Sequence, residues 1–208
     1  MKCFRYSFLS DGPSDRVLMP AIDWLLRRHS RHAFAGEWAE LRRLPRPPRG
    51  LVERIKICLD LYPCELLFVH RDAESATHSE RVAEIRRALE AVEAPPTVCV
   101  VPVRMQEAWL LFNEVALREA ADNPNGGERI QLPALSSLEE VLDPKEVLHE
   151  LLKKVSGRSG RRLKSFDARE RIYRLAQILS DYSPLLQVPA FRALDVEVQK
   201  TIRENGWV

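Results

Sequence analysis

The sequence predicts an α/β fold with a mostly parallel sheet flanked by helices, followed by a C-terminal helical extension. Apolar runs of strand length alternate with longer segments of helical periodicity, and this alternation is typical of a parallel sheet. Beyond residue 127 only helical patterns remain. We therefore expect an α/β domain over residues 1–127 and a helical extension over residues 128–208 that packs on it.

Three predicted strands are apolar and run directly into acidic residues. They are residues 4–9, 65–69 and 97–103. The first is followed by Asp11, the second by Asp72 and Glu74, and the third by Glu107. A shorter strand is expected at residues 37–41, and the proline-rich segment 42–49 after it is too irregular for either kind of element.

The predicted helices carry apolar residues on one face. In the first, Leu18, Ile22 and Leu25 share a face, Ser14 is a suitable N-cap, and Pro20 predicts a kink or a delayed start. The later helices are expected at residues 51–62, 78–92, 107–121, 144–155, 167–180 and 196–205.

The composition is that of an ordinary soluble globular protein, with 45% apolar and 30% charged residues. The sequence has no apolar stretch long enough for a transmembrane helix, and its start does not resemble a signal peptide. Its four cysteines form no C-x-x-C pair, so we expect reduced core thiols, no zinc site and a cytoplasmic location.

The net charge of +2 conceals a segregation of charge along the chain. Residues 105–150 contain ten acidic and three basic residues, whereas residues 151–175 contain nine basic and two acidic residues. This pattern indicates either a surface that faces a polyanion or two charged lobes that attract each other. Charge alone does not distinguish the two.

The acidic residues at the strand ends predict a metal site. The carboxyl ends of parallel strands meet at one edge of the sheet, where α/β proteins bind ligands. We therefore expect Asp11, Asp72 and Glu107 to converge to within roughly 10 Å and, with Glu74, to bind Mg²⁺ or Mn²⁺. Each acid also has an ordinary explanation, as a turn residue, a solvated loop residue or a helix N-terminal acid.

Three motifs resemble the TOPRIM domain, in particular a small bacterial TOPRIM-like family, the domain of unknown function 4276. Residues 11–15, Asp-Gly-Pro-Ser-Asp, are similar to the first TOPRIM motif, in which a Glu usually stands where Asp11 stands. Residues 70–74, His-Arg-Asp-Ala-Glu, resemble the Asp-x-Asp motif. Residues 107–111, Glu-Ala-Trp-Leu-Leu, look like a helix start of the smaller family.

The resemblance implies a Rossmann-like fold and a magnesium-dependent phosphodiesterase that acts on nucleic acid, related to the overcoming-lysogenization-defect nucleases. It also implies a partner ATPase and a role in defence against phage. Asp11, Asp72, Glu74 and Glu107 would be the catalytic, metal-binding acids. Asp11 in place of Glu, and His70 in place of a carboxylate, suggest the alternative of a degenerate module that binds an ATPase or nucleic acid without cleaving it.

A glycine-flanked basic segment contributes Arg158, Arg161, Arg162 and Lys164. We expect it to be a flexible loop that contacts the phosphate backbone of nucleic acid. It lacks the interleaved aromatic residues of single-strand binders, which favours contacts with duplex backbone. Docking of this loop on the acidic segment 105–150 is the alternative.

Overall fold

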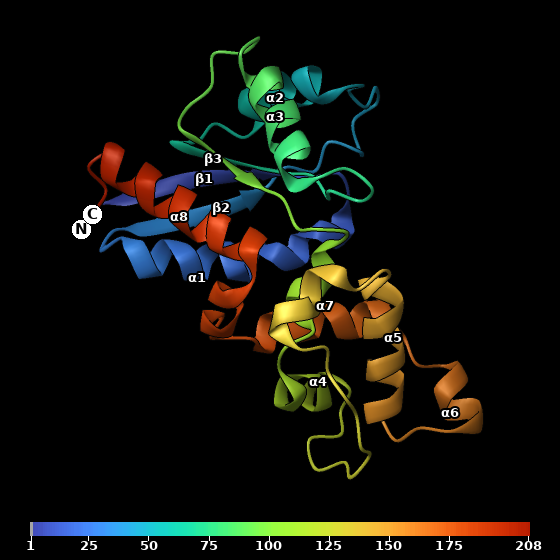
Figure 1. Cartoon of the computed structure of the whole chain (residues 1–208). Coiled ribbons are helices and arrows are strands. Elements are labelled where there is room, and N and C mark those ends of the chain that lie inside the picture. The colour runs from blue at the N-terminus through green and yellow to red at the C-terminus, as the bar shows by residue number, and fades with distance from the viewer. Residues whose placement is uncertain (1) are drawn as a thin grey trace.

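The computed structural model describes residues 2–208 and contains a four-stranded, all-parallel sheet flanked by helices (Figure 1). The strands lie in the order β2-β1-β3-β4. Their bounds are Cys3–Leu9 for β1, Ala33–Trp38 for β2, Leu66–His70 for β3 and Thr97–Val100 for β4. The predicted α/β fold class is confirmed.

The sheet is covered on both faces, as all-parallel sheets require. All five residues of β3 are buried, and they alternate between two apolar layers. Leu66 and Phe68 face α1 (Met19–His29) and α8 (Pro189–Glu204). Leu67 and Val69 face α2 (Leu51–Leu61) and α3 (His78–Leu89). In Figure 1, α2 and α3 lie above the sheet, α1 lies below it, and α8 crosses in front of the strands.

The remaining helices gather on one side of the sheet (Figure 1). They are α4 (Glu114–Ala120), α5 (Pro144–Val155), α6 (Gly160–Lys164) and α7 (Ala168–Ile178). Four short 3₁₀ helices connect the parts: η1 (Pro13–Leu18), η2 (Gln106–Leu110), η3 (Leu135–Glu140) and η4 (Ser183–Gln187). Because α7 packs on η1 and α5 packs on η2, these helices reach the segments that follow β1 and β4.

Several predicted element bounds differ from the structure. The helix expected at residues 107–121 is divided into η2 and α4, because Asn113 caps α4 by accepting a 3.0 Å hydrogen bond from the Ala116 N–H. The last helix begins at Pro189, seven residues before its predicted start at 196. The segment expected to be a flexible basic loop includes the short helix α6, which projects away from the sheet in Figure 1.

One continuous hydrophobic cluster contains residues from both predicted parts of the chain, 1–127 and 128–208. At its centre the Phe191 ring of α8 packs edge-on against Trp109 of η2, with centroids 5.0 Å apart, and parallel to the ring of Tyr182. This packing fixes η2, the segment that also carries Glu107. No helix in the described residues 2–208 is long and apolar enough to cross a membrane.

We predict that Phe191→Ala lowers the free energy of unfolding by about 3–5 kcal/mol, because it leaves a cavity beside two large aromatic rings. Val196→Ala is the matched control on the same helix, since Val196 is 55% exposed, and it should change stability by less than about 0.5 kcal/mol. Urea denaturation of both variants measures the difference. Equal losses in the two variants would contradict the assigned role of Phe191.

Candidate functional site

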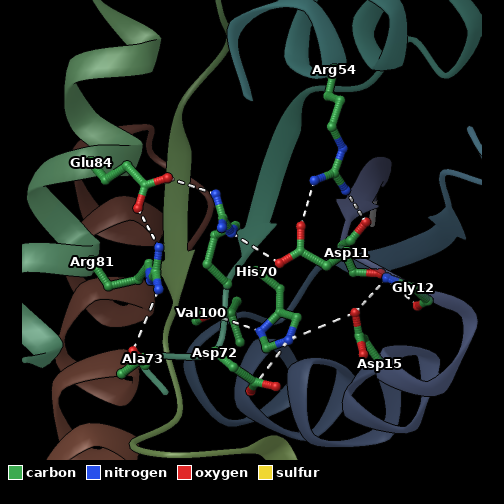
Figure 2. Close-up of polar contacts among 12 residues, drawn as sticks. Asp11, Gly12, Asp15, Arg54, His70, Asp72, Ala73, Arg81, Glu84 and Val100 are labelled. Atoms are coloured by element: carbon green, nitrogen blue, oxygen red, sulfur yellow. Dashed lines mark hydrogen bonds and ion pairs between the residues drawn. The ribbon is translucent and has the colours of Figure 1, made fainter. Parts of the chain in front are cut away.

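Three side chains meet where β1 and β3 end, of which Asp15 and His70 are buried and Asp72 is 22% exposed. Asp15 lies in η1, His70 is the last residue of β3, and Asp72 follows two residues later. The Nε2 atom of His70 is 3.8 Å from an Asp15 carboxylate oxygen and 3.6 Å from Oδ1 of Asp72 (Figure 2). Because β1 and β3 are parallel neighbours, their carboxyl ends deliver these groups to the same edge of the sheet.

The tautomer of His70 follows from its other ring nitrogen. Nδ1 lies 2.9 Å from the carbonyl oxygen of Val100, which can only accept a hydrogen bond, so Nδ1 carries a proton. In the neutral ring Nε2 therefore presents a lone pair towards Asp15 and Asp72. Burial lowers the pKa of His70, although the nearby charge of Asp15 opposes this change. We infer that His70 is neutral at physiological pH.

Asp72 is an acid whose pKa lies far above its ordinary value. Burial raises its pKa to about 8, and the negative charges of Asp15, Glu107 and Asp11 contribute to the increase. Its Oδ1 atom is buried and has no hydrogen-bond partner, and the same holds for Oε1 of Gln106. Buried oxygens without partners are unusual in folded proteins, so this pair marks the pocket as a place where a ligand would be accommodated.

Glu107 is the third buried acid of this region and comes from η2. Burial raises its pKa, while the positive charge of Lys145 on α5 lowers it. Gln106, the preceding residue, donates a 3.2 Å hydrogen bond to Oδ1 of Asp15. The segment after β4 therefore joins the cluster formed at the ends of β1 and β3.

Asp11 is neutralised by two arginines. Its carboxylate forms ion pairs with Arg54 of α2 and with Arg71, whose Nε is 2.9 Å away. Arg71 in turn contacts Glu84 of α3 at 2.6 Å, and Glu84 also pairs with Arg81 (Figure 2). This chain of ion pairs occupies both carboxylate oxygens of Asp11 in the structure.

Glu74 lies outside the buried cluster. It is exposed, and its backbone has a left-handed φ of 54°. Its N–H donates to the carbonyl of Arg104 at 3.1 Å, which continues the pairing between the segments that follow β3 and β4. Of the four acids predicted from sequence, the structure therefore brings Asp72 and Glu107 together, holds Asp11 between arginines, and leaves Glu74 in solvent.

Asp15, His70 and Gln106 were not among the predicted site residues. Asp15 belongs to the first TOPRIM-like motif, where Asp11 was given the functional role. The carboxylate of Asp15 accepts a 2.7 Å hydrogen bond from the Gly12 N–H, so the tight turn directs it inward. His70 was noted only as a substitution for a carboxylate, and nothing in the sequence distinguishes Gln106.

The donor atoms in the pocket suit a hard divalent cation in kind, since they are carboxylate and amide oxygens. Among residues 2–208, no group of three or more His, Cys, Asp or Glu side chains is arranged to hold a metal ion. The imidazole of His70 lies between Asp15 and Asp72 instead.

In the predicted basic segment one residue contacts the acidic segment 105–150, and the other three are exposed to solvent. Arg158 pairs with Asp122 at 3.4 Å and lies over the Phe166 ring, so this one residue contacts the acidic segment 105–150. Arg161, Arg162 and Lys164 lie on α6 and are exposed. These three side chains are available to a polyanion.

Comparisons with protein-family models, with curated proteins and with solved structures find no match to this chain.

We predict that Asp72→Asn stabilises the metal-free protein increasingly as pH rises. The carboxyl of Asp72 has a folded-state pKa of about 8, whereas that of an unfolded aspartate is about 3.9. Between these values the folded state binds the extra proton, so the contribution of Asp72 to stability declines as pH increases. Asparagine does not titrate, so the variant lacks the decline in folding stability that Asp72 causes as pH rises.

Thermal melts in EDTA from about pH 5 to 9 measure the difference, and each kcal/mol should appear as about 2–4 °C. Asp60→Asn is the control, because Asp60 is an exposed acid of α2. A melting difference between Asp72→Asn and the wild type that is constant with pH would contradict the protonated state of Asp72.

Proposed function

We propose that this chain is a magnesium- or manganese-dependent phosphodiesterase that acts on nucleic acid, as its resemblance to TOPRIM proteins implies. The observation that carries the proposal is the buried, unpartnered oxygen of Asp72 among the acids Asp15 and Glu107. Acids crowded at the carboxyl edge of a parallel sheet repel one another, and a divalent cation relieves that repulsion.

Asp72 would be the direct ligand of the ion, since among the described residues no three acids are arranged to enclose one. The negative charges of Asp15 and Glu107 and the amide oxygen of Gln106 would add to the attraction. When bound, such an ion neutralises charge on a phosphate and lowers the pKa of a water molecule. His70 would act as a positioning residue. It is 1% exposed and lies between Asp15 and Asp72, so it sets their spacing without reaching a substrate.

Exposed basic side chains support a polyanionic substrate. Arg161, Arg162 and Lys164 are exposed on α6, and Arg42 lies against the turn at Gly12. Such residues would contact phosphates in a salt-dependent manner.

The second candidate is a degenerate module that binds nucleic acid or a partner ATPase without cleavage. Two observations favour it. His70 lies between two of the acids, and Asp11 is held by Arg54 and Arg71. The two candidates differ in whether the pocket takes up a metal ion.

We predict that binding of Mg²⁺ or Mn²⁺ releases a proton near pH 7, because Asp72 must ionise before its carboxylate can bind the ion. Calorimetric titrations in buffers with different ionisation enthalpies measure the number of protons released. Asp72→Asn should abolish both this release and any metal-dependent cleavage of labelled oligonucleotides, whereas Asp60→Asn should preserve them.

Glu74→Gln tests whether Glu74 binds the ion, as the sequence predicts, or stays in solvent, as the structure shows it. If the buried acids hold the ion, this exposed change leaves metal affinity within about twofold. Absence of metal binding by the wild-type chain would refute the metal-dependent candidate and favour the non-cleaving module.

A further inference from the structure

A cavity beside the acid pocket is lined by basic side chains from three separate segments. It has a volume of about 300 Å³ and lies between η1, α5 and α7. Its basic residues are Lys145 and His149 of α5, Arg169 of α7, and Arg42 from the segment after β2. Glu107 also lines this cavity, which places it directly next to the proposed catalytic acids.

The basic groups face the cavity because of helical spacing. Lys145 and His149 are four residues apart on α5, so they lie on one face of that helix. Within the described chain, the ion pairs of α5 and α7 are made by Lys153, Arg171 and Arg174, and neither Lys145 nor Arg169 takes part. The Nε2 atom of His149 is buried and has no hydrogen-bond partner. The cavity thus contains positive charge and a free polar atom that no protein group satisfies.

Apolar and aromatic residues also line the cavity. They include Val17, Ile172 and Tyr173, and Tyr173 is 37% exposed. Its hydroxyl donates a 2.6 Å hydrogen bond to the carbonyl of Pro13, which fixes the ring at the border of η1. An anchored, partly exposed ring of this kind provides a stacking surface for a base.

A second, shallower hollow continues from this cavity. It has a volume of about 470 Å³, shares His149 and Arg169 with the first, and ends at Lys164 of α6. The two hollows form a path from Glu107, past Lys145 and Arg169, towards the exposed basic residues of α6.

We propose that this basic groove, formed by Arg42, Lys145, His149, Arg169 and Tyr173, binds one strand of single-stranded nucleic acid and leads it to the acid pocket. The inference rests on the proposed function for its substrate class, and it replaces the duplex contact expected from sequence. A cavity of about 300 Å³ is at the lower limit for small-molecule sites, so it accommodates one nucleotide unit and excludes a duplex. The cationic wall would contact phosphate, and Tyr173 would stack on a base.

Binding in EDTA tests the groove separately from catalysis. The probe is a fluorescein-labelled single-stranded 12-mer, followed by anisotropy, with a duplex of the same length in parallel. The groove variant is Lys145→Ala/Arg169→Ala. The control is Lys200→Ala/Arg203→Ala on the remote helix α8, which removes the same charge from exposed positions.

We expect the groove variant to bind the single strand at least tenfold more weakly, and the control variant to remain within twofold of the wild type. The slope of log affinity against log salt should decrease by about 1.4, since each lost single-strand phosphate contact contributes about 0.7. Tyr173→Leu should weaken binding of the single strand and leave binding of the duplex unchanged.

Four results would overturn the inference: no binding by the wild type, equal losses in the groove and control variants, a duplex bound as tightly as the single strand, or displacement of the oligonucleotide by millimolar inorganic phosphate. The last would indicate a site for free phosphate. Groove-dependent binding without metal-dependent cleavage would support the groove while refuting the phosphodiesterase, so the two proposals fail separately.

Discussion

The hydrogen bond between Nδ1 of His70 and the carbonyl of Val100 fixes the tautomer of the imidazole in the acid pocket. It presents the lone pair of Nε2 to Asp15 and Asp72, while burial and the neighbouring acids raise the pKa of Asp72 to about 8. This arrangement exists because β3 is buried on both faces, so that its last side chain cannot reach solvent. A parallel sheet covered by two helical layers thus imposes a low-dielectric environment on the groups at its carboxyl edge.

Charge in this region is divided between two environments a few residues apart. Asp15 and Glu107 are buried, Asp72 is mostly buried, and among the described residues only His70 lies within ion-pair distance of these acids. Asp11 instead lies in a row of alternating charges with Arg54 and Arg71. The first environment favours protonation or the uptake of a cation, whereas in the second the charge of Asp11 is already compensated by arginines. This difference in surroundings explains why Asp11 and Asp15, which lie four residues apart, do not have the same chemical properties.

The fold was largely predictable from sequence, and the site was predictable only in part. Apolar runs such as residues 65–69 define the strands because burial on both faces requires them, and the strand ends locate the pocket at the carboxyl edge. The orientation of each acid depends on contacts that no local pattern contains. The Gly12 N–H turns Asp15 inward, while Arg54, distant in sequence, draws Asp11 away. The groove was not predicted either, because Lys145, Arg169 and Tyr173 converge only through the packing of α5 and α7 beside η1.

The ion pairs of Asp11 constrain how this sequence can change over time. The side chains of Arg54 and Arg71 are only 18% and 25% exposed, and both pair with the single carboxylate of Asp11. Because Arg71 also pairs with Glu84, a neutral residue at position 11 would leave chiefly Arg54 as a partly buried positive charge without an acidic partner. A lone substitution there is therefore costly even if Asp11 has no role in chemistry. In related sequences, positions 11, 54 and 71 should therefore covary as a set, and an invariant Asp11 would not by itself be evidence of catalysis.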